Sequence, residues 1–241
     1  MKVAVVGYGK MGREVAAVLR ERGHEAVITL RGSDFPAGVP VGVDFTQPDV
    51  VLENTRAALK AKARYVIGTT GWDAERDELA RLVAEAKGGV VHAANFSLGV
   101  NLFYRVVREA AALFARFPEY DPYVLERHHR QKKDAPSGTA RALARILEDS
   151  GGPRRHAATA LDGALADDHF HVAALRAGGI VGEHTVGFDS GGDEVLLEHR
   201  ARTRRGFALG AVLAAEWIAE RTGLHGFEDV VDDLARRGSS A

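Results

Sequence analysis

A glycine-rich motif stands close to the start of the chain, between an apolar run and a helical pattern. The run over 3–6 is typical of a strand buried on both faces, and the helical period covers 11–22. The motif between them is a complete G-x-G-x-x-G, made of Gly7, Tyr8, Gly9, Lys10, Met11 and Gly12. Glycines at this spacing permit a tight turn and let the backbone approach a pyrophosphate at the helix N-terminus. This context favours a dinucleotide-binding loop over an ordinary turn between a strand and a helix.

The chain up to residue 97 continues this alternation of strands and helices. The patterns predict strands at 26–30, 41–45, 65–67 and 90–93, with helices over 49–62 and 73–87. Asp73 is the expected cap of the second helix. Alternation of this kind implies right-handed crossovers and a parallel sheet with helices on both faces. The sequence therefore predicts an α/β domain of the Rossmann type.

A different texture follows Ser97 and indicates a second domain. Helices are expected over 100–116 and from the turn at 134–139 to about 149, and strands at 123–127, 170–176, 181–188 and 194–203. The polar stretch after Gly151 is interpreted as a surface loop. Strands separated by glycine-rich turns favour an antiparallel or mixed sheet, hence an α+β domain. Two further helices, over 206–221 and 227–236, leave open which domain they pack against.

The second half of a dinucleotide fingerprint is missing. A carboxylate about 20 residues beyond the glycines usually holds the adenine ribose, but Arg31 and Ser33 occupy that region here. Because an arginine can pair with a 2′-phosphate, NADPH is favoured, without excluding NADH. Two other loops follow predicted parallel strands, at the edge where such sheets bind ligands. They contain Gly68, Thr69 and Thr70, and Ala93, Ala94, Asn95 and Phe96.

The densest group of titratable side chains lies at 126–139, where two histidines, two arginines and two lysines precede a turn of small residues. Ser137 or Thr139 is positioned to cap the helix that follows, whose N-terminus attracts an anion. Cationic side chains and proton donors at one point suit a small molecule with several carboxylates. The alternative is a solvated basic loop with an incidental histidine pair.

Composition excludes several other classes. The 32 Lys+Arg against 33 Asp+Glu argue against binding to nucleic acid by bulk charge. The absence of cysteine excludes disulfides, thiolate metal sites and cysteine nucleophiles. Histidine pairs occur at 128–129 and at 169 and 171, but no zinc-protease spacing is present, so no metal site is expected. No apolar stretch reaches the length of a membrane span, and a cytoplasmic protein is expected.

The basic cluster also carries a resemblance. The stretch over 128–139 reads HHRQKKDAPSGT, which resembles the HHxxKxDAPSGT signature of the dihydrodipicolinate reductase family. GYGKMG, GTTGW, AANFSLGVN, RAGGIVGEHTV and FALGAVLAAEW occur in the order that this family shows, so the resemblance covers nearly the whole chain. It implies an NAD(P)H-dependent oxidoreductase of the diaminopimelate and lysine pathway. The implied reaction reduces 4-hydroxy-tetrahydrodipicolinate, a cyclic imine dicarboxylate, to tetrahydrodipicolinate.

The resemblance also implies an organisation and a set of roles. A Rossmann domain would comprise 1–97 and 206–241, and a substrate-binding and tetramerisation domain 98–205. His128 matches the proton donor and Lys132 the second donor, and Arg204 matches an arginine near the nicotinamide. The groups that match the holders of the substrate are His129, Ser137, Gly138, Thr139 and Thr70. The loop at 68–70 and the loop at 93–96 match the cofactor loops.

Two departures and two alternatives accompany this resemblance. Many members have one more residue in the glycine loop, so phosphate contacts are expected to shift by a residue. The missing acid near residue 30 leaves the cofactor preference open. The alternatives are another two-domain dehydrogenase, similar to aspartate dehydrogenase, and a non-catalytic NAD(P)H sensor. The signature at 128–139 weighs against both, because a sensor needs no proton donor and the other dehydrogenase would lack this block.

Overall fold

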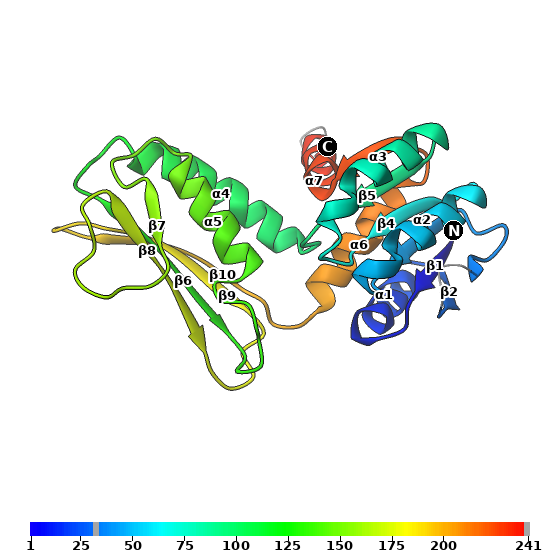
Figure 1. The fold of residues 1–241 in the computed structure, drawn as a ribbon, viewed down its shortest axis with the longest axis horizontal. Helices are drawn as coiled ribbons and strands as arrows, with labels where there is room; N and C mark the ends of the chain where they lie inside the picture. The colour runs from blue at the N-terminus through cyan, green and yellow to red at the C-terminus, as the bar shows by residue number, and fades with distance from the viewer. Residues whose placement is uncertain (31–33, 239–241) are drawn as a thin grey trace. The chain divides into compact units, whose positions relative to one another are not determined.

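The protein folds into two compact units, shown in the computed structural model of Figure 1. The structure describes residues 1–30 and 34–238. One unit comprises Met1–Leu98 with Arg204–Ala241, and the other is Gly99–Thr203. The boundaries expected from the sequence, 97/98 and 205/206, lie next to these. The second unit is therefore an insertion in the chain of the first.

The first unit contains a six-stranded parallel sheet. Its strands are β1 (Lys2–Val6), β2 (Glu25–Thr29), β3 (Val41–Asp44), β4 (Arg64–Ile67), β5 (Gly89–His92) and β11 (Gly223–Gly226). Their order is β11-β5-β4-β3-β1-β2, and every neighbouring pair is parallel. The central strands are runs of valine buried on both faces, as strands between two helical layers must be. The predicted Rossmann-type sheet is confirmed.

Helices cover both faces of this sheet. The helices α1 (Lys10–Glu21), α6 (Arg205–Ile218) and α7 (Phe227–Gly238) pack in one core cluster with Val3 and Val5. The helices α2 (Val51–Lys60) and α3 (Arg76–Glu85) pack in another with Val6. Successive side chains of a strand point to opposite faces, so β1 alone contributes to both cores. The last two helices belong to the first unit, the placement that the resemblance implied.

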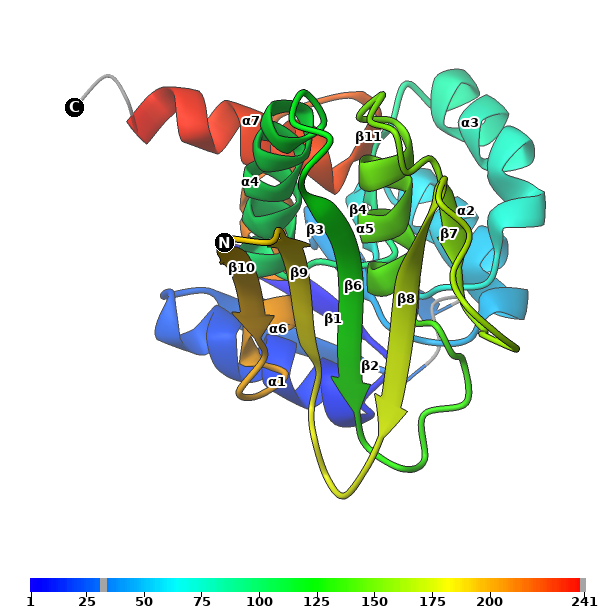
Figure 2. The same ribbon diagram turned by 90° about the vertical axis from the view of Figure 1, so that its left-hand side faces the viewer.

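The second unit is a mixed sheet with two helices on one face (Figure 2). The strands are β6 (Asp121–His128), β7 (His156–Ala158), β8 (His169–Arg176), β9 (Glu183–Asp189) and β10 (Glu194–Arg200), in the order β10-β9-β6-β8-β7. The central strand β6 runs parallel to β8 and antiparallel to β9. The helices α4 (Leu98–Phe114) and α5 (Gly138–Glu148) bury an apolar stripe against them. The predicted α+β unit is confirmed.

Three details of the sequence analysis were wrong. The polar stretch after Gly151 contains β7, and the link between α6 and α7 contains β11. Both are edge strands of three or four residues, too short to show a period. Asp73 does not cap a helix, because it begins the 3-10 turn η3 (Asp73–Glu75) and α3 follows with Glu75 at its N-cap. A second 3-10 turn, η2 (Pro48–Val50), likewise precedes α2.

Candidate functional site

The glycine loop joins β1 to α1 through close backbone contacts. Gly7 has a φ of +82°, a conformation that favours glycine. A Cβ on Gly12 would lie 2.1 Å from the carbonyl oxygen of Gly7, so no larger residue fits at that position. A Cβ on Gly9 would meet no described atom within 4 Å. The loop is therefore closely packed at Gly12 and open at Gly9.

The open side of this loop suits a phosphate. Gly9 is the N-cap of α1, and no described side chain makes a capping hydrogen bond there. The first turn of α1 contains no acidic residue and includes Lys10. Backbone N–H groups at such a helix end attract anions. The residues present therefore fit a dinucleotide, whose phosphates the 7–12 loop would hold.

The other predicted cofactor loops lie at the same edge of the sheet, because the strands before them are parallel. Thr69 is buried after β4 while Thr70 is exposed. Asn95, after β5, accepts a hydrogen bond from the backbone N–H of Ser97 at 2.8 Å. Arg204 is an exposed residue that directly precedes α6, and Arg31 lies outside the described residues. The structure thus brings the glycine loop and the loops after β4 and β5 together.

A buried carboxylate that the sequence analysis missed connects the loop after β4 to the loop after β3. Asp44, at the end of β3, is inaccessible to solvent. Its Oδ1 accepts hydrogen bonds from the N–H of Thr46 at 2.8 Å, the Thr46 hydroxyl at 2.6 Å and the Thr69 hydroxyl at 3.3 Å. Its Oδ2 accepts from Asn54 Nδ2 and the Tyr65 hydroxyl, both at 2.9 Å. Five donors therefore satisfy one buried carboxyl group and fix the loops after β3 and β4.

In the second unit, the predicted proton donor lies at the end of β6 above another buried carboxylate. His128 is the last residue of β6, with 9% of its side chain exposed. Glu126, two residues earlier on the same face, is fully buried. Its Oε1 accepts a hydrogen bond from the N–H of Ser137 at 2.9 Å and from Nη2 of Arg176 at 2.7 Å. Its Oε2 lies 3.2 Å from Nδ1 of His128.

The electrostatics of this cluster keep Glu126 ionised. Burial raises the pKa of its carboxyl, but the polar contacts with His128, His184, Ser137 and Arg176 outweigh that effect and hold the pKa far below its usual range. Burial also lowers the pKa of His184, which favours its neutral form. The cluster therefore contains a buried anion, a guanidinium that balances it, and imidazoles next to both.

The turn after β6 presents the other predicted residues. Ser137 is the N-cap of α5 and accepts from the N–H of Ala140 at 3.1 Å, so it, and not Thr139, is the cap. Gly138 is exposed in the first turn, and no described atom lies within 4 Å of a Cβ built on it. The first turn of α5 has no acidic residue, which leaves its N-terminus suited to a carboxylate.

The second predicted donor, Lys132, lies in this turn as an ion pair with a neighbour. Its Nζ is 2.8 Å from Oδ1 of Asp134, and 23% of its side chain is exposed. Burial raises the pKa of Asp134, but the hydrogen bond from Lys132 outweighs this and the pKa is lowered. His129 follows β6 directly and is half-buried. The structure therefore places His128, His129, Lys132 and the N-terminus of α5 within one unit.

The same cluster offers a set of metal ligands. One ligand atom from each of Glu126, His128 and His184 lies within 4.8 Å of the others. The guanidinium of Arg176 already contacts this carboxylate, which disfavours a second cation. The expectation that the protein has no metal site stays a prediction.

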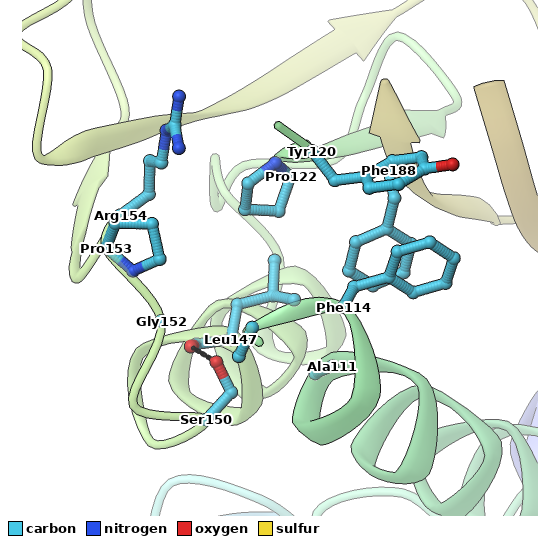
Figure 3. Close-up of a pocket in the computed structure, with 11 residues that line it drawn as sticks. Ala111, Phe114, Tyr120, Pro122, Leu147, Ser150, Gly152, Pro153, Arg154 and Phe188 are labelled. Atoms are coloured by element: carbon cyan, nitrogen blue, oxygen red, sulfur yellow. Dashed lines mark hydrogen bonds between the residues drawn. The ribbon is translucent and has the colours of Figure 1, made fainter. Parts of the chain in front are cut away.

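A pocket at another place in the second unit contains none of the predicted residues (Figure 3). Phe114, Leu147 and Phe188 form its apolar wall, and Arg154 lies at its rim. Arg154 is engaged with the carbonyl oxygen of Pro118 at 2.8 Å. The pocket therefore offers mainly apolar packing surface, and its arginine is already bonded to the protein backbone.

Sequence reasoning missed Asp44, Glu126, Arg176 and His184. A weak signal existed, because Asp44 and Glu126 each end an apolar run in which a charged residue is costly without partners. The partners of Glu126 come from 50 and 58 residues further on, at Arg176 and His184, so local pattern did not reveal them.

No helix within the described residues is long and apolar enough to cross a membrane.

Comparisons with known proteins agree with this arrangement. Residues 24–96 match the family model for the N-terminus of dihydrodipicolinate reductase, and residues 99–231 match the model for its C-terminus. The chain is 34% identical to the 4-hydroxy-tetrahydrodipicolinate reductase of Christiangramia forsetii, over 97% of this chain and 99% of the relative. It is 38% identical to the enzyme of the same name from Natronomonas pharaonis, over 96% of this chain and all of the relative.

A solved structure shows the same fold. The dipicolinate-bound dihydrodipicolinate reductase from Paenisporosarcina sp. TG-14 is similar with a TM-score of 0.73 and 26% identity, over 95% of this chain and 98% of that one. These relatives confirm the predicted class, an NAD(P)H-dependent oxidoreductase with a small-molecule substrate, and they decide against the two alternatives. The two family models together leave out the glycine loop at 7–12, where the departure in loop length occurs. The chain belongs to the dihydrodipicolinate reductase family, as its motifs predicted.

Proposed function

We propose that this protein reduces 4-hydroxy-tetrahydrodipicolinate to tetrahydrodipicolinate with NAD(P)H, in diaminopimelate and lysine biosynthesis. The observation that carries the proposal is the position of His128, at a strand end above a buried carboxylate and in the same turn region as the N-terminus of α5. Membership of the family supports the same reaction. The reduced nicotinamide supplies a hydride when it is bound.

His128 and Lys132 have the role of proton donors in this proposal. Reduction of a conjugated imine leaves negative charge on the substrate, which a positioned acid must neutralise. His128 is almost buried and held on one side by Glu126, so it is the better positioned of the two. Lys132 is more exposed and is paired with Asp134. A substrate carboxylate would compete with Asp134 for the ammonium group of Lys132.

The substrate carboxylates have a separate set of partners. The N-terminus of α5 offers backbone N–H groups at Gly138 and Thr139, and the adjacent turn carries His129 and Lys132. A relative in this family binds dipicolinate, a ring with two carboxylates, which supports a dicarboxylate as the ligand. We assign Ser137 to the cap of α5 and Thr70 to the cofactor side of the site, where it is exposed after β4.

The cofactor proposal is NADPH, NADH or both. The loops at 7–12, 68–70 and 93–96 would hold the nucleotide, with Arg204 contributing near the nicotinamide. Arg31 stays the proposed partner of a 2′-phosphate. If Arg31→Ala weakens NADPH and leaves NADH unchanged, this assignment is supported, and equal weakening of both cofactors contradicts it.

A coupled assay tests the function. Dihydrodipicolinate synthase generates the substrate, and the loss of reduced nicotinamide absorbance reports turnover with each cofactor. His128→Gln and Lys132→Ala are expected to lower kcat by about 10²- to 10⁴-fold, the contribution of a positioned acid, with nucleotide affinity retained. Lys133→Ala is the matched control, because Lys133 is exposed next to Lys132. No oxidation of either cofactor by the unmodified protein would contradict the proposed reaction.

The assembly and the compartment stay predictions. A homotetramer and a cytoplasmic location were expected from the resemblance and from the sequence. Light scattering of the purified protein would measure the first.

A further inference from the structure

We propose that Glu126 is a positioning residue for His128: its carboxylate keeps the proton on Nδ1, so that Nε2 is the nitrogen presented to the substrate. The inference rests on the proposed function, in which His128 donates a proton. It adds a residue outside the signature at 128–139, and it assigns different tasks to the two ring nitrogens of His128.

The first observation is that two buried polar atoms face each other. Oε2 of Glu126 and Nδ1 of His128 are both buried, and neither has a well-aligned hydrogen-bond partner within the described chain. They lie 3.2 Å apart, a hydrogen-bond distance with poor alignment. Catalytic hydrogen bonds are often poorly aligned before the substrate binds. Because burying an unpaired polar atom is costly, each atom is the natural partner of the other.

The second observation is that the other half of the carboxylate is anchored. Oε1 accepts from the N–H of Ser137 and from Nη2 of Arg176. The same Nη2 also donates to the carbonyl oxygen of Asp134 at 2.6 Å. The N-cap residue of α5 and an arginine of β8 thus fix the orientation of Glu126, and the Asp134 carbonyl in the turn after β6 holds that arginine. Oε2 is left to accept from a histidine.

Two imidazoles lie near Oε2, and distance separates them. Nε2 of His184 is 3.7 Å from Oε2, but only 3.2 Å from the hydroxyl oxygen of Ser137. The His184 ring packs edge-on against the His128 ring, with centroids 5.0 Å apart. His184 therefore has its nearest polar partner in Ser137 and supports the His128 ring from the side. Nδ1 of His128 is the closer donor for Glu126.

The third observation concerns the outward side of His128. Its Nδ1 is buried while 9% of the side chain is exposed, so the exposed part of the ring lies away from Nδ1. A Cβ on Gly182 would lie 3.1 Å from Nε2, so the lack of a side chain at residue 182 leaves space beside that nitrogen. A neutral imidazole has one donor and one acceptor nitrogen, and the partner of one nitrogen sets the role of the other. Glu126 on Nδ1 thus makes Nε2 the proton-exchanging atom.

Two measurements test the inference. Nitrogen NMR of the full-length protein labelled with ¹⁵N-histidine reads the tautomer of His128 directly, with His128→Gln to assign its signals. We expect the Nδ1–H form for neutral His128. In the coupled assay, Glu126→Gln is expected to lower kcat by about 10²-fold, because a neutral amide holds the imidazolium less well. The KM for nucleotide is expected to stay unchanged. Glu126→Asp, which keeps the charge, is expected to recover part of kcat.

Controls separate this inference from simpler explanations. Glu183→Gln is the matched control, because Glu183 is a carboxylate of the same sheet that pairs with Arg127; its kcat is expected to match the unmodified protein. An Nε2–H tautomer of His128, or full kcat in Glu126→Gln, would overturn the inference while leaving the proposed function intact. Loss of activity on treatment with a chelator, with recovery on adding zinc, would overturn it in favour of a metal site at the cluster. An unmodified protein that does not turn over the substrate contradicts the proposed function instead, and the NMR result is independent of that outcome.

Discussion

Replacing Asp44 by asparagine tests how the proposed nucleotide-binding edge of the first unit is held together. Two donors, Asn54 Nδ2 and the Tyr65 hydroxyl, point at Oδ2, and three more point at Oδ1. Asparagine has the same shape but only one carbonyl oxygen. At least two buried donors then face an NH₂ group, which accepts no hydrogen bond.

The size of the effect follows from the count of orphaned donors. Each buried donor left without an acceptor costs about 1–3 kcal/mol, so the loss in free energy of unfolding is about 2–6 kcal/mol. For a chain of this size, about 2–4 °C in Tm accompanies each kcal/mol. Asp44→Asn is therefore expected to lower Tm by about 4 °C or more.

Differential scanning calorimetry measures this change, and Asp49→Asn is the matched control. Asp49 is an exposed carboxylate of the same loop region, where substitution is expected to change stability by no more than about 0.5 kcal/mol. Nucleotide affinity is expected to fall only in Asp44→Asn, because the loops after β3 and β4 are then held less firmly by residue 44. A Tm equal to that of the control would refute the reasoning.

Two further predictions concern the glycine loop and the response to pH. Gly12→Ala is expected to lower both Tm and nucleotide affinity, because its Cβ would lie 2.1 Å from the Gly7 carbonyl oxygen. Gly9→Ala is expected to keep Tm and lose nucleotide affinity, because its Cβ enters open space where the phosphate would lie. Calorimetry combined with NADPH titration measures Tm and affinity for both variants. Identical behaviour of Gly12→Ala and Gly9→Ala would contradict the proposed phosphate site at the 7–12 loop. For pH, burial lowers the pKa of His184, so protonation favours the unfolded chain. The stability of the folded state with neutral His184 is complete above the pKa of about 6.5 that this histidine has in the unfolded chain, and part of it is lost as pH falls below that value. Tm is therefore expected to decline on acidification, less steeply in His184→Asn, and equal slopes would rule out this role of His184.

The sequence predicted the sheet of the first unit well because its strands are continuous apolar runs between helical patterns. The glycine loop was also predictable, since its spacing is a local property. The edge strands β7 and β11 were missed because their own residues show no strand pattern. They are strands because they pair with β8 and β5. Pairing between distant segments is not visible in a local pattern.

The candidate site was predictable only in its outward-facing half. His128, Lys132 and the turn before α5 are contiguous in sequence and carry a recognisable signature. Glu126 was passed over because a single acid in a strand is typical of a solvent-facing position. Its burial depends on Arg176, whose distance along the chain hides the pairing. Arg31 lies outside the described residues, so the prediction that it contacts the cofactor stays a prediction.

The order of segments along the chain has a consequence for how the protein folds while it is being translated. The helix α6, which buries eight of its residues in the core of the first unit, and the edge strand β11 both follow the inserted second unit. During translation, the sheet formed by β1 to β5 has one apolar face incompletely covered until residues beyond 218 have left the ribosome. The inserted unit has its own core and all of its strands by residue 200. A chain released by a premature stop near residue 204 is therefore expected to carry a folded second unit and an aggregation-prone first one, and quality control is expected to remove it.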